Sequence, residues 1–264
     1  MGKSKDLATG ETRFVNTAGD TMTGNLGVKA TLKTTHADAD VVQFGGTGYL
    51  ANWEDAEVYL SENMYQDTSG AYKYLTASHA SLYSQTTGKH QFRVAGSGSA
   101  DAAITFNTAL EIDNDGHITK PNQSAFLSDM QGITQDNLGG SVSTTIQFGN
   151  EVFDQNADYN TSTYTFTAPV TGRYMLGSNL NYSQWDVSGN YVWMVIVTSN
   201  NTWYLDLKNA NVITADGYYG QQGCVLADMD ANDTAYVAVA SSGMANQMDM
   251  ITGTSSQFFG YLVA

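Results

Sequence analysis

Short runs of apolar, aromatic and β-branched residues recur along the chain from residue 41 onward, and glycine, asparagine or aspartate separates them. Residues 163–168 place Tyr164 and Phe166 on one side and threonines on the other, which is the period of a half-buried strand. Residues 191–198 are apolar on both sides, as expected for a central strand of a sandwich. Six or more such runs in the C-terminal half, with turns between them, predict an all-β fold that contains a sandwich.

The polarity of the chain comes mainly from uncharged side chains and is biased toward acid. Only 14% of the 264 residues are charged, and 26 acidic against 11 basic residues give a net charge of −15. Phosphate binding needs clustered lysine and arginine, which the sequence lacks, so we expect neither a nucleic acid partner nor an anionic membrane partner. No apolar run approaches the roughly 20 residues of a membrane span, so no membrane insertion is expected. The first residues, MGKSKDLATGE, lack the apolar core of a secretory signal, which predicts synthesis in a cytoplasm.

Residues 12–40 carry isolated apolar side chains that lie too far apart to form a core within one chain. Identical copies wound together would bury these side chains along a shared axis. The stretch NTAGDTMTGNL at residues 16–26 resembles the GDTMTG-x-L shaft repeat of bacteriophage tail fibres. The resemblance implies a virion protein, so we expect residues 1–40 to form a leader and an intertwined trimeric shaft. Because no globular anchor precedes the shaft, the leader is expected to dock into another virion protein.

Three segments follow the expected shaft. Residues 41–127 hold short alternating runs and are expected to form a small middle β module. Within it, the turn residues 113–116 between apolar residues predict a hairpin over 109–120. Residues 128–143 are rich in serine, glycine and aspartate, which predicts a linker, and residues 144–264 form the expected head.

The head resembles a known family over nearly all of its length. Residues 148–176 are similar to the signature of the complement component 1q globular head, a jelly-roll family related to tumour necrosis factor. The last ten residues, SSQFFGYLVA, resemble the closing strand of that family. One departure is Asn232, which stands before Asp233 where the family usually has glycine. The residues that we assign to the structural family motif are Phe166, Pro169, Gly172, Tyr174, Phe259, Gly260 and Leu262.

The resemblance implies a compact trimer of ten-stranded jelly rolls. The density of tyrosine and phenylalanine on the expected strands agrees, because one sandwich core needs less apolar surface than the sequence offers. The fold expected for the whole chain is therefore an elongated, all-β, homotrimeric fibre. It would consist of the intertwined N-terminal shaft, the small middle module and the C-terminal jelly-roll head.

The sequence offers little that would support catalysis or a cofactor. The four histidines are scattered through the first half of the chain and none falls in the head, so no triad is anchored, and we expect no enzyme. Glu111, Asp113, Asp115 and Gly116 imitate positions of a calcium loop, but its last position is Asn122 instead of glutamate. We therefore expect a plain hairpin turn there, no metal site and no cofactor, although calcium stays an open alternative.

Aromatic side chains beside amide and hydroxyl groups are typical of surfaces that bind a saccharide or a protein receptor. Segments between the expected head strands carry such groups, and the competing interpretation of each aromatic is packing in the core or the trimer. Met244, Met248 and Met250, and the single cysteine Cys224, are expected to be buried. The receptor-binding candidates are Tyr182, Gln184, Trp185, Asp186, Tyr218, Tyr219 and Gln221.

These features together predict a fibre of the phage virion whose trimeric head binds a glycan or protein on the host surface during adsorption. Three heads per fibre would add avidity to the binding of each head. The alternative is a structural fibre of the capsid or neck that decorates or connects parts of the virion without decisive receptor recognition. A free-standing lectin-like protein of a cell is a third interpretation, and the shaft motif counts against it.

Overall fold

The computed structural model describes residues 26–28, 30, 32–36, 39–53, 57–140, 143–212, 217–245 and 248–264. They belong to two compact units, which divide between Thr119 and Lys120 and are described separately below. Both units are built from strands, and one turn of 3-10 helix, η1 (Ala210–Val212), is the only helical element among these residues. No helix in the described part of the chain is long and apolar enough to cross a membrane. The predicted shaft lies outside the described residues as far as residue 25.

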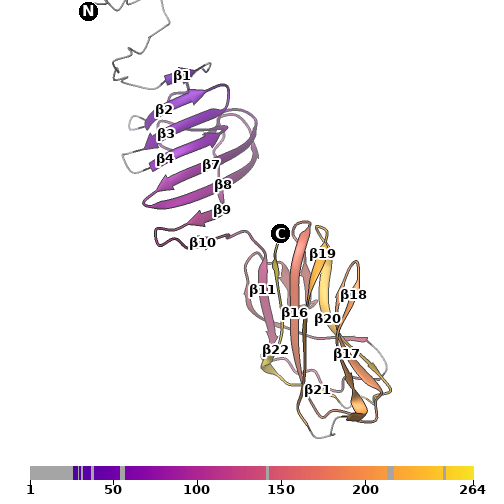
Figure 1. Ribbon diagram of the computed structural model, residues 1–264. Coiled ribbons are helices and arrows are strands. Elements are labelled where there is room, and N and C mark those ends of the chain that lie inside the picture. Colours follow the sequence, from indigo (N-terminus) through magenta and orange to yellow (C-terminus); the bar gives the residue numbers. More distant parts are fainter. Residues whose placement is uncertain are drawn as a thin grey trace, which may run out of the picture. The chain divides into compact units, whose positions relative to one another are not determined.

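The N-terminal unit is one long sheet with a short hairpin beside it (Figure 1). The sheet has the order β1-β2-β3-β4-β7-β8-β9-β10, with β1 parallel to β2 and every other pair antiparallel. The hairpin pairs β5 with β6. The strands are β1 (Leu26–Val28), β2 (Ala39–Phe44), β3 (Gly48–Trp53), β4 (Glu57–Glu62), β5 (Met64–Gln66), β6 (Tyr72–Tyr74), β7 (Ser78–Thr86), β8 (Lys89–Gly98), β9 (Asn107–Ile112) and β10 (Ile118–Thr119).

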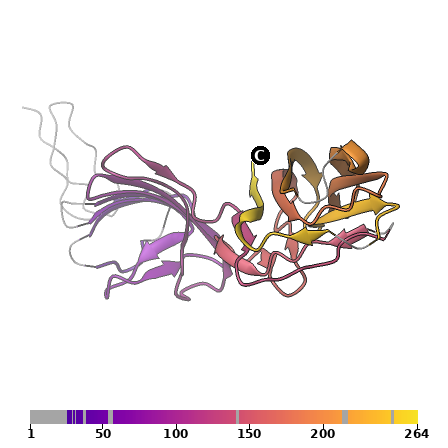
Figure 2. The same cartoon turned by 90° about the horizontal axis from the view of Figure 1, so that it is seen from below.

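The core of this unit lies between one face of the sheet and the β5–β6 hairpin, which Figure 2 shows on one side of the sheet. Alternation in the strands turns Tyr49, Tyr59 and Leu82 toward the hairpin, and all three are buried. Asn63 holds the hairpin in place through its side chain, which donates to the carbonyl of His79 at 2.8 Å and accepts from the amide of Thr76 at 2.7 Å. The core therefore covers only one face of the sheet.

Two sequence predictions fall within this unit. The β9–β10 pair forms the predicted hairpin around residues 113–116. Leu26–Val28, which the sequence analysis placed in the shaft, instead extends the sheet as β1 through parallel pairing with residues 42–44. The reason is tertiary, because the edge of β2 offers unpaired backbone groups to this short run.

The C-terminal unit is a sandwich of two antiparallel sheets (Figures 1 and 2). The first, which we call the β16 sheet, has the order β13-β11-β22-β16-β19, with β21 paired to β16; the second, the β17 sheet, has the order β14-β15-β20-β17-β18, with β12 paired to β20. The strands of the β16 sheet are β11 (Ala125–Met130), β13 (Asn150–Asp154), β16 (Gly172–Ser183), β19 (Tyr219–Met229), β21 (Asp249–Met250) and β22 (Gly253–Leu262). Those of the β17 sheet are β12 (Ser143–Thr145), β14 (Tyr159–Asn160), β15 (Thr165–Thr167), β17 (Tyr191–Thr198), β18 (Thr202–Asn209) and β20 (Thr234–Ser242).

Aromatic rings fill the core of the sandwich. Phe126 stacks on Phe166 with 4.8 Å between ring centroids and meets Phe258 edge-on at 5.0 Å. Gly260 allows this packing, because a Cβ there would lie 2.8 Å from the Phe126 ring. The Tyr174 hydroxyl donates to the carbonyl of Val170 at 2.7 Å and fixes the turn into β16. The motif residues Phe166, Gly260 and Tyr174 thus serve the core and its turns, whereas Phe259 lies on the outward face of its sheet.

The boundary between the units differs from the predicted one. Residues 128–143 were expected to be a linker, but β11 ends at Met130 and pairs with β22 and β13, and β12 begins at Ser143. The division therefore falls after Thr119 instead of after residue 127. Serine and aspartate are poor strand formers, but here Ser128 is buried and donates to the carbonyl of Phe148 at 2.8 Å.

The chain enters and leaves the head at the same end. The amide of Leu262 donates to the carbonyl of Ser124, and the amide of Arg173 donates to the carbonyl of Ala264. From there the twelve residues of β16 carry the chain about 36 Å to the opposite end, which we call the distal end. Figure 1 shows the C-terminus at one end of the head and β21 near the other. Among the described residues, the distal end is formed by residues 184–190, 210–212, 217–218, 243–245 and 248–249.

Candidate functional site

The three distal segments converge on Gly189. A Cβ at this glycine would lie 2.3 Å from Cγ of Met244 and 3.3 Å from Cβ of Ala210, so only glycine lets the segments approach so closely. Backbone hydrogen bonds complete the junction, since Asn190 donates to Ser242 and Ala210 donates to Asn190. The described part of the distal end is therefore one connected surface instead of separate loops.

Asp186 ties two of these segments together. Its Oδ1 accepts from the amide and the hydroxyl of Ser188 at 2.8 and 2.6 Å, and its Oδ2 accepts from the amide of Ala245 at 2.6 Å. These hydrogen bonds, first the one from the Ser188 hydroxyl, hold the pKa of the Asp186 carboxyl below its usual range. The carboxylate is thus ionised at neutral pH and organises the loops.

An aromatic base lies directly beneath this surface. Trp185 is buried between Tyr182 and Tyr219, with ring centroids 5.4 and 5.5 Å away. The Tyr182 hydroxyl donates to Oε1 of the buried Gln221 at 2.8 Å. Burial raises the pKa of Tyr182 well above its ordinary value, so the hydroxyl stays protonated and donates. These side chains support the loops from within the core.

The structure divides the seven receptor-binding candidates into two groups. Tyr182, Trp185 and Gln221 are buried, each with 1% or less of its surface exposed, so they are not accessible on this chain. The accessible ones are Gln184, Asp186, Tyr218 and Tyr219, and Tyr218 is 79% exposed. Buried and exposed residues therefore alternate along β19 and the turn after β16.

Two further predictions concern the burial of single residues, and one of them is confirmed while the other is wrong. Met244, Met248 and Met250 are buried, which confirms that they fill the core. The prediction for Cys224 is wrong, because its side chain is exposed. Cys224 pairs with Gly177 across β19 and β16 and so points away from the sandwich core.

Sequence reasoning missed an aromatic group on the outward face of the β17 sheet. Trp193 and Tyr204 meet edge-on at 5.4 Å, and Tyr204 is 59% exposed. Leu207, opposite Trp193 in the ladder, is also exposed. The alternation of β18 was the available signal, but Leu205 is an extra residue opposite Met194 and Val195, and this bulge interrupts the alternation that shows which side chains point outward.

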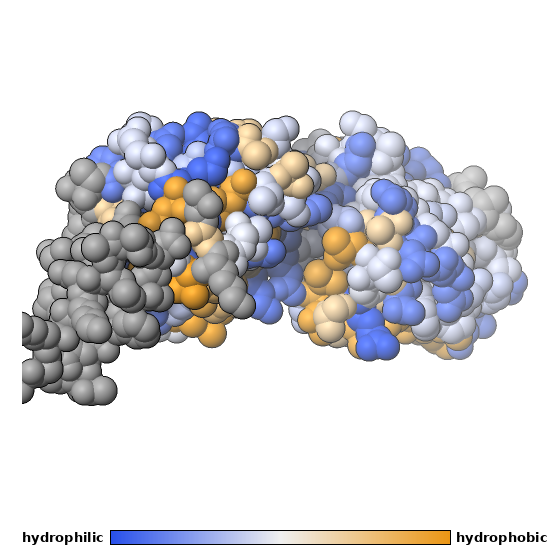
Figure 3. All heavy atoms as spheres, turned by 90° about the horizontal axis from the view of Figure 1, so that it is seen from above, coloured by the Kyte–Doolittle hydropathy of each residue, from blue (hydrophilic) through white to orange (hydrophobic). Residues whose placement is uncertain are grey.

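The outward face of the β16 sheet also carries an apolar surface, which we call the head apolar face. Paired residues of neighbouring strands share this face: Leu127 lies between Phe153 and Phe259, and Met175 lies between Tyr261 and Leu226. The Phe259 ring lies over Gly177, where a Cβ would be 2.3 Å from it. Leu226, Tyr261 and Phe153 are each between 46% and 49% exposed. Figure 3 shows hydrophobic residues gathered in a patch on each of the two units.

The acidic hairpin of the N-terminal unit resembles a cation site only in part. Ligand atoms of Asp113, Asp115 and His117 lie within 4.8 Å of one another, but the Asp113 carboxylate already accepts from the amides of Asp115 and His117. Glu111 points elsewhere, because it accepts from Lys89 and Gln91. The arrangement matches the hairpin turn expected from the sequence.

Comparisons with known proteins bear on the head. The C1q domain model matches residues 125–263. No curated protein sequence matches the chain. Among solved structures, the globular domain of zebrafish complement 1qA protein is 13% identical, with a TM-score of 0.41, and the match covers 54% of this chain and 98% of that one. Murine APRIL at pH 8.0 is 11% identical, with a TM-score of 0.39, and the match covers 54% of this chain and all of that one.

The family match starts at the first residue of β11 and ends one residue after β22, so it takes in both sheets of the head. It accounts for the aromatic core built on Phe126, Phe166 and Tyr174 and for the jelly-roll resemblance of the sequence. C1q-type and tumour-necrosis-factor-like domains are non-enzymatic binding modules and are typically homotrimeric. The chain belongs to the C1q domain family.

Proposed function

We propose that the chain is a homotrimeric fibre protein of a bacteriophage whose C1q-type head binds a glycan or protein on the host surface during adsorption. The observation that carries the proposal is the distal end of the head. It lies opposite the point where the chain enters, and it presents Gln184 and Tyr218 to solvent above the buried base of Trp185 and Tyr182. Exposed aromatic and amide side chains at one end of a domain are typical of binding surfaces for saccharides and proteins.

The trimer is supported by the family and by the head apolar face. Half-exposed Leu226, Tyr261 and Phe153 leave apolar surface that association with further copies would remove from water. Three heads on one fibre turn later binding events into intramolecular ones and so raise avidity without a new contact. The phage context rests on the shaft resemblance of residues 16–26, which lie outside the described residues except for Leu26.

The binding proposal is tested with the full-length chain on an array of bacterial surface glycans and on intact bacterial cells. The distal variant combines Gln184→Ala with Tyr218→Ala; the matched control is Val170→Ala, which changes a 48% exposed residue at the chain-entry end. We expect the distal variant to lose about tenfold or more in affinity while the control binds as the natural chain does. Equal losses, or no binding by a properly folded trimer to array or cells, would refute receptor recognition by the distal end.

Position on the particle separates adhesion from a purely structural role. An antibody against residues 144–264, applied to intact particles and located by electron microscopy, is expected to label the tail. Label on the capsid or neck would instead favour the decorating or connecting fibre.

A further inference from the structure

One face of the long sheet in the N-terminal unit has no covering layer among the described residues. The β5–β6 hairpin and the core lie on the other face (Figure 2). The strand register brings seven apolar side chains into a single row across seven strands, each paired with the next. The row consists of Leu26, Val42, Leu50, Leu60, Tyr83, Phe92 and Leu110. We use the name open face for this row together with the two rows of side chains that flank it on the same side of the sheet.

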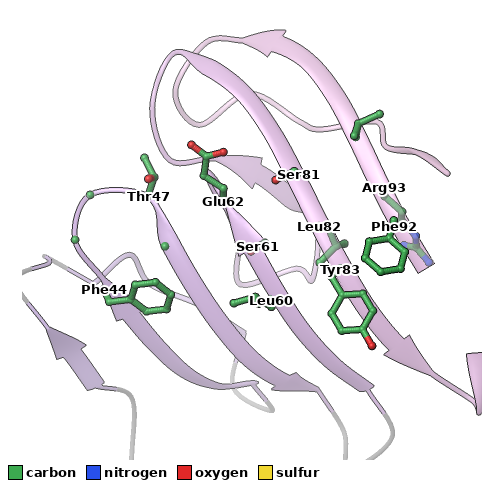
Figure 4. Close-up of a pocket in the computed structure, with 14 residues that line it drawn as sticks. Phe44, Thr47, Leu60, Ser61, Glu62, Ser81, Leu82, Tyr83, Phe92 and Arg93 are labelled. Carbon is green, nitrogen blue, oxygen red and sulfur yellow. The ribbon is translucent and has the colours of Figure 1, made fainter. Parts of the chain in front are cut away.

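The middle of the open face is half-exposed and shallow. Leu60 is 50% exposed and Phe92 is 48% exposed. Figure 4 shows Phe44, Leu60, Tyr83 and Phe92 on the same side of neighbouring strands, where they line a depression of about 650 Å³. The Phe44 ring lies over Gly48, where a Cβ would be 2.3 Å from it, so the surface stays flat at this edge. A second depression of about 540 Å³ continues the surface past Leu50 and Val58.

The charges of the open face suit association with another copy of the same chain. A chain with a net charge of −15 repels its copies, so contact requires a surface with little acid. The acidic residues of the open face are Asp40 and Glu62, and both lie in the rows that flank the apolar one. The ion pair of Lys89 with Glu111 lies on the opposite face, because both residues alternate with members of the apolar row.

The size of the open face is also that of an interface. Seven strands spaced about 4.8 Å apart span roughly 29 Å, and three rows of side chains cover roughly 20 Å along the strands. The product, about 600 Å² per copy, is close to the roughly 800 Å² that each partner contributes to a standard interface. An apolar patch at the upper end of the roughly 300–600 Å² found on typical monomers often marks an interaction surface.

We propose that the open face is buried against the open faces of two further copies of this chain. The inference rests on the proposed trimer of the head. Three heads that associate hold their N-terminal units at high effective concentration, so even a face of modest affinity becomes occupied. The N-terminal unit then supplies a second interface between copies, independent of the head apolar face.

The test uses the full-length chain with Cys224→Ser as background, because Cys224 is the only natural cysteine. Leu60→Cys places a thiol in the middle of the open face. Thr68→Cys is the matched control, since Thr68 is exposed in the turn of the β5–β6 hairpin on the other side of the sheet. Each variant is treated with a maleimide polymer to measure accessibility and with a short bismaleimide to link chains, and native mass is recorded alongside.

The proposal expects Leu60→Cys to react about tenfold more slowly than Thr68→Cys and to be linked between chains by the bismaleimide. Equal reactivity in particles that still have the mass of three chains would overturn the inference and leave the head trimer standing. A native mass of one chain would instead overturn the trimer itself. If Leu60→Cys does not fold, Val94→Cys on the same face takes its place, since Val94 is 49% exposed.

Protection without linkage between chains would also overturn the inference. Deletion of residues 2–25 then identifies the alternative occupant. If this deletion makes Leu60→Cys reactive, the N-terminal segment of the same chain covers the open face.

Discussion

Gln221 joins the two sheets of the head at their distal end. Its side chain accepts from the Tyr182 hydroxyl within the β16 sheet and donates to the carbonyls of Val192 and Asp206 in the β17 sheet, at 3.2 and 2.9 Å. All polar atoms of this amide are therefore used in a site that is 1% exposed. A buried polar group of this kind stabilises the fold only as long as every partner is present.

Gln221→Leu should remove these three hydrogen bonds and leave the buried Tyr182 hydroxyl without its acceptor. We expect the free energy of unfolding of the head to fall by about 2–4 kcal/mol, measured by denaturant titration with Trp fluorescence. Adding Tyr182→Phe should restore part of the loss, because the stranded hydroxyl is then absent. If Gln221→Leu alone is as stable as the natural chain, the hydrogen bonds of Gln221 contribute nothing to the stability of the head.

At the level of elements, the distal segments are ordered by hydrogen bonds to side chains and not by backbone pairing between strands. Asp186 is the main tie, because it accepts from residue 188 of its own segment and from residue 245 of another. The pKa of the Asp186 carboxyl is lowered in the folded chain, so ionisation of this group is coupled to loop order. The stabilising contribution is complete above the unfolded pKa of about 3.9 and is lost as the pH falls through the lower native value.

Asp186→Asn should therefore lower the melting temperature of the head by about 2–4 °C at pH 7, because the amide replaces one charged acceptor oxygen with a donor. The difference between variant and natural chain should shrink below about pH 3.9, where the natural carboxyl also becomes protonated. Scanning calorimetry from pH 7 to pH 3 measures this difference in melting temperature. A difference that stays constant with pH would mean that the charge of Asp186 is not involved.

At the scale of the whole molecule, each unit has one apolar sheet face that no layer of its own described residues covers. The head apolar face includes Tyr261 and Leu226, and the open face of the N-terminal unit includes Leu60 and Phe92. Scattered apolar residues are normal on a protein surface, but rows that cross several strands are not. Two such faces on one acidic chain favour association of copies along both units.

Tyr261→Asp should break the proposed trimer, because association would bring three new carboxylates together in an apolar interface. Native mass spectrometry at micromolar concentration should then show single chains of 28.4 kDa in place of trimers. Tyr204→Asp is the control, since Tyr204 is similarly exposed but lies on the β17 sheet. If both variants keep the mass of three chains, association through the head apolar face is not required for the trimer.

Local patterns were sufficient for many of the strands and for parts of the core, but not for β1 and the end of β11. The turn at residues 113–116 and the motif residues Phe166 and Tyr174 could be read from spacing and resemblance, because hairpins and family motifs depend on neighbours in the sequence. The sequence grouped the candidate site residues by segment but did not separate the buried members from the exposed ones. Tyr182 and Gln221 are 39 residues apart, and only the pairing of β16 with β19 brings them into one buried contact.

Patterns in the amino-acid sequence were enough to show that the chain is built from strands, that its C-terminal half is a C1q-type jelly roll and that its net charge is acidic. Strand pairing over long distances in the chain was needed to show that residues 128–130 belong to the head sheet, that Cys224 points outward and that β1 joins the N-terminal sheet. The physical reason is that alternation shows that a strand has two different faces, whereas what covers each face depends on strands far away in the chain.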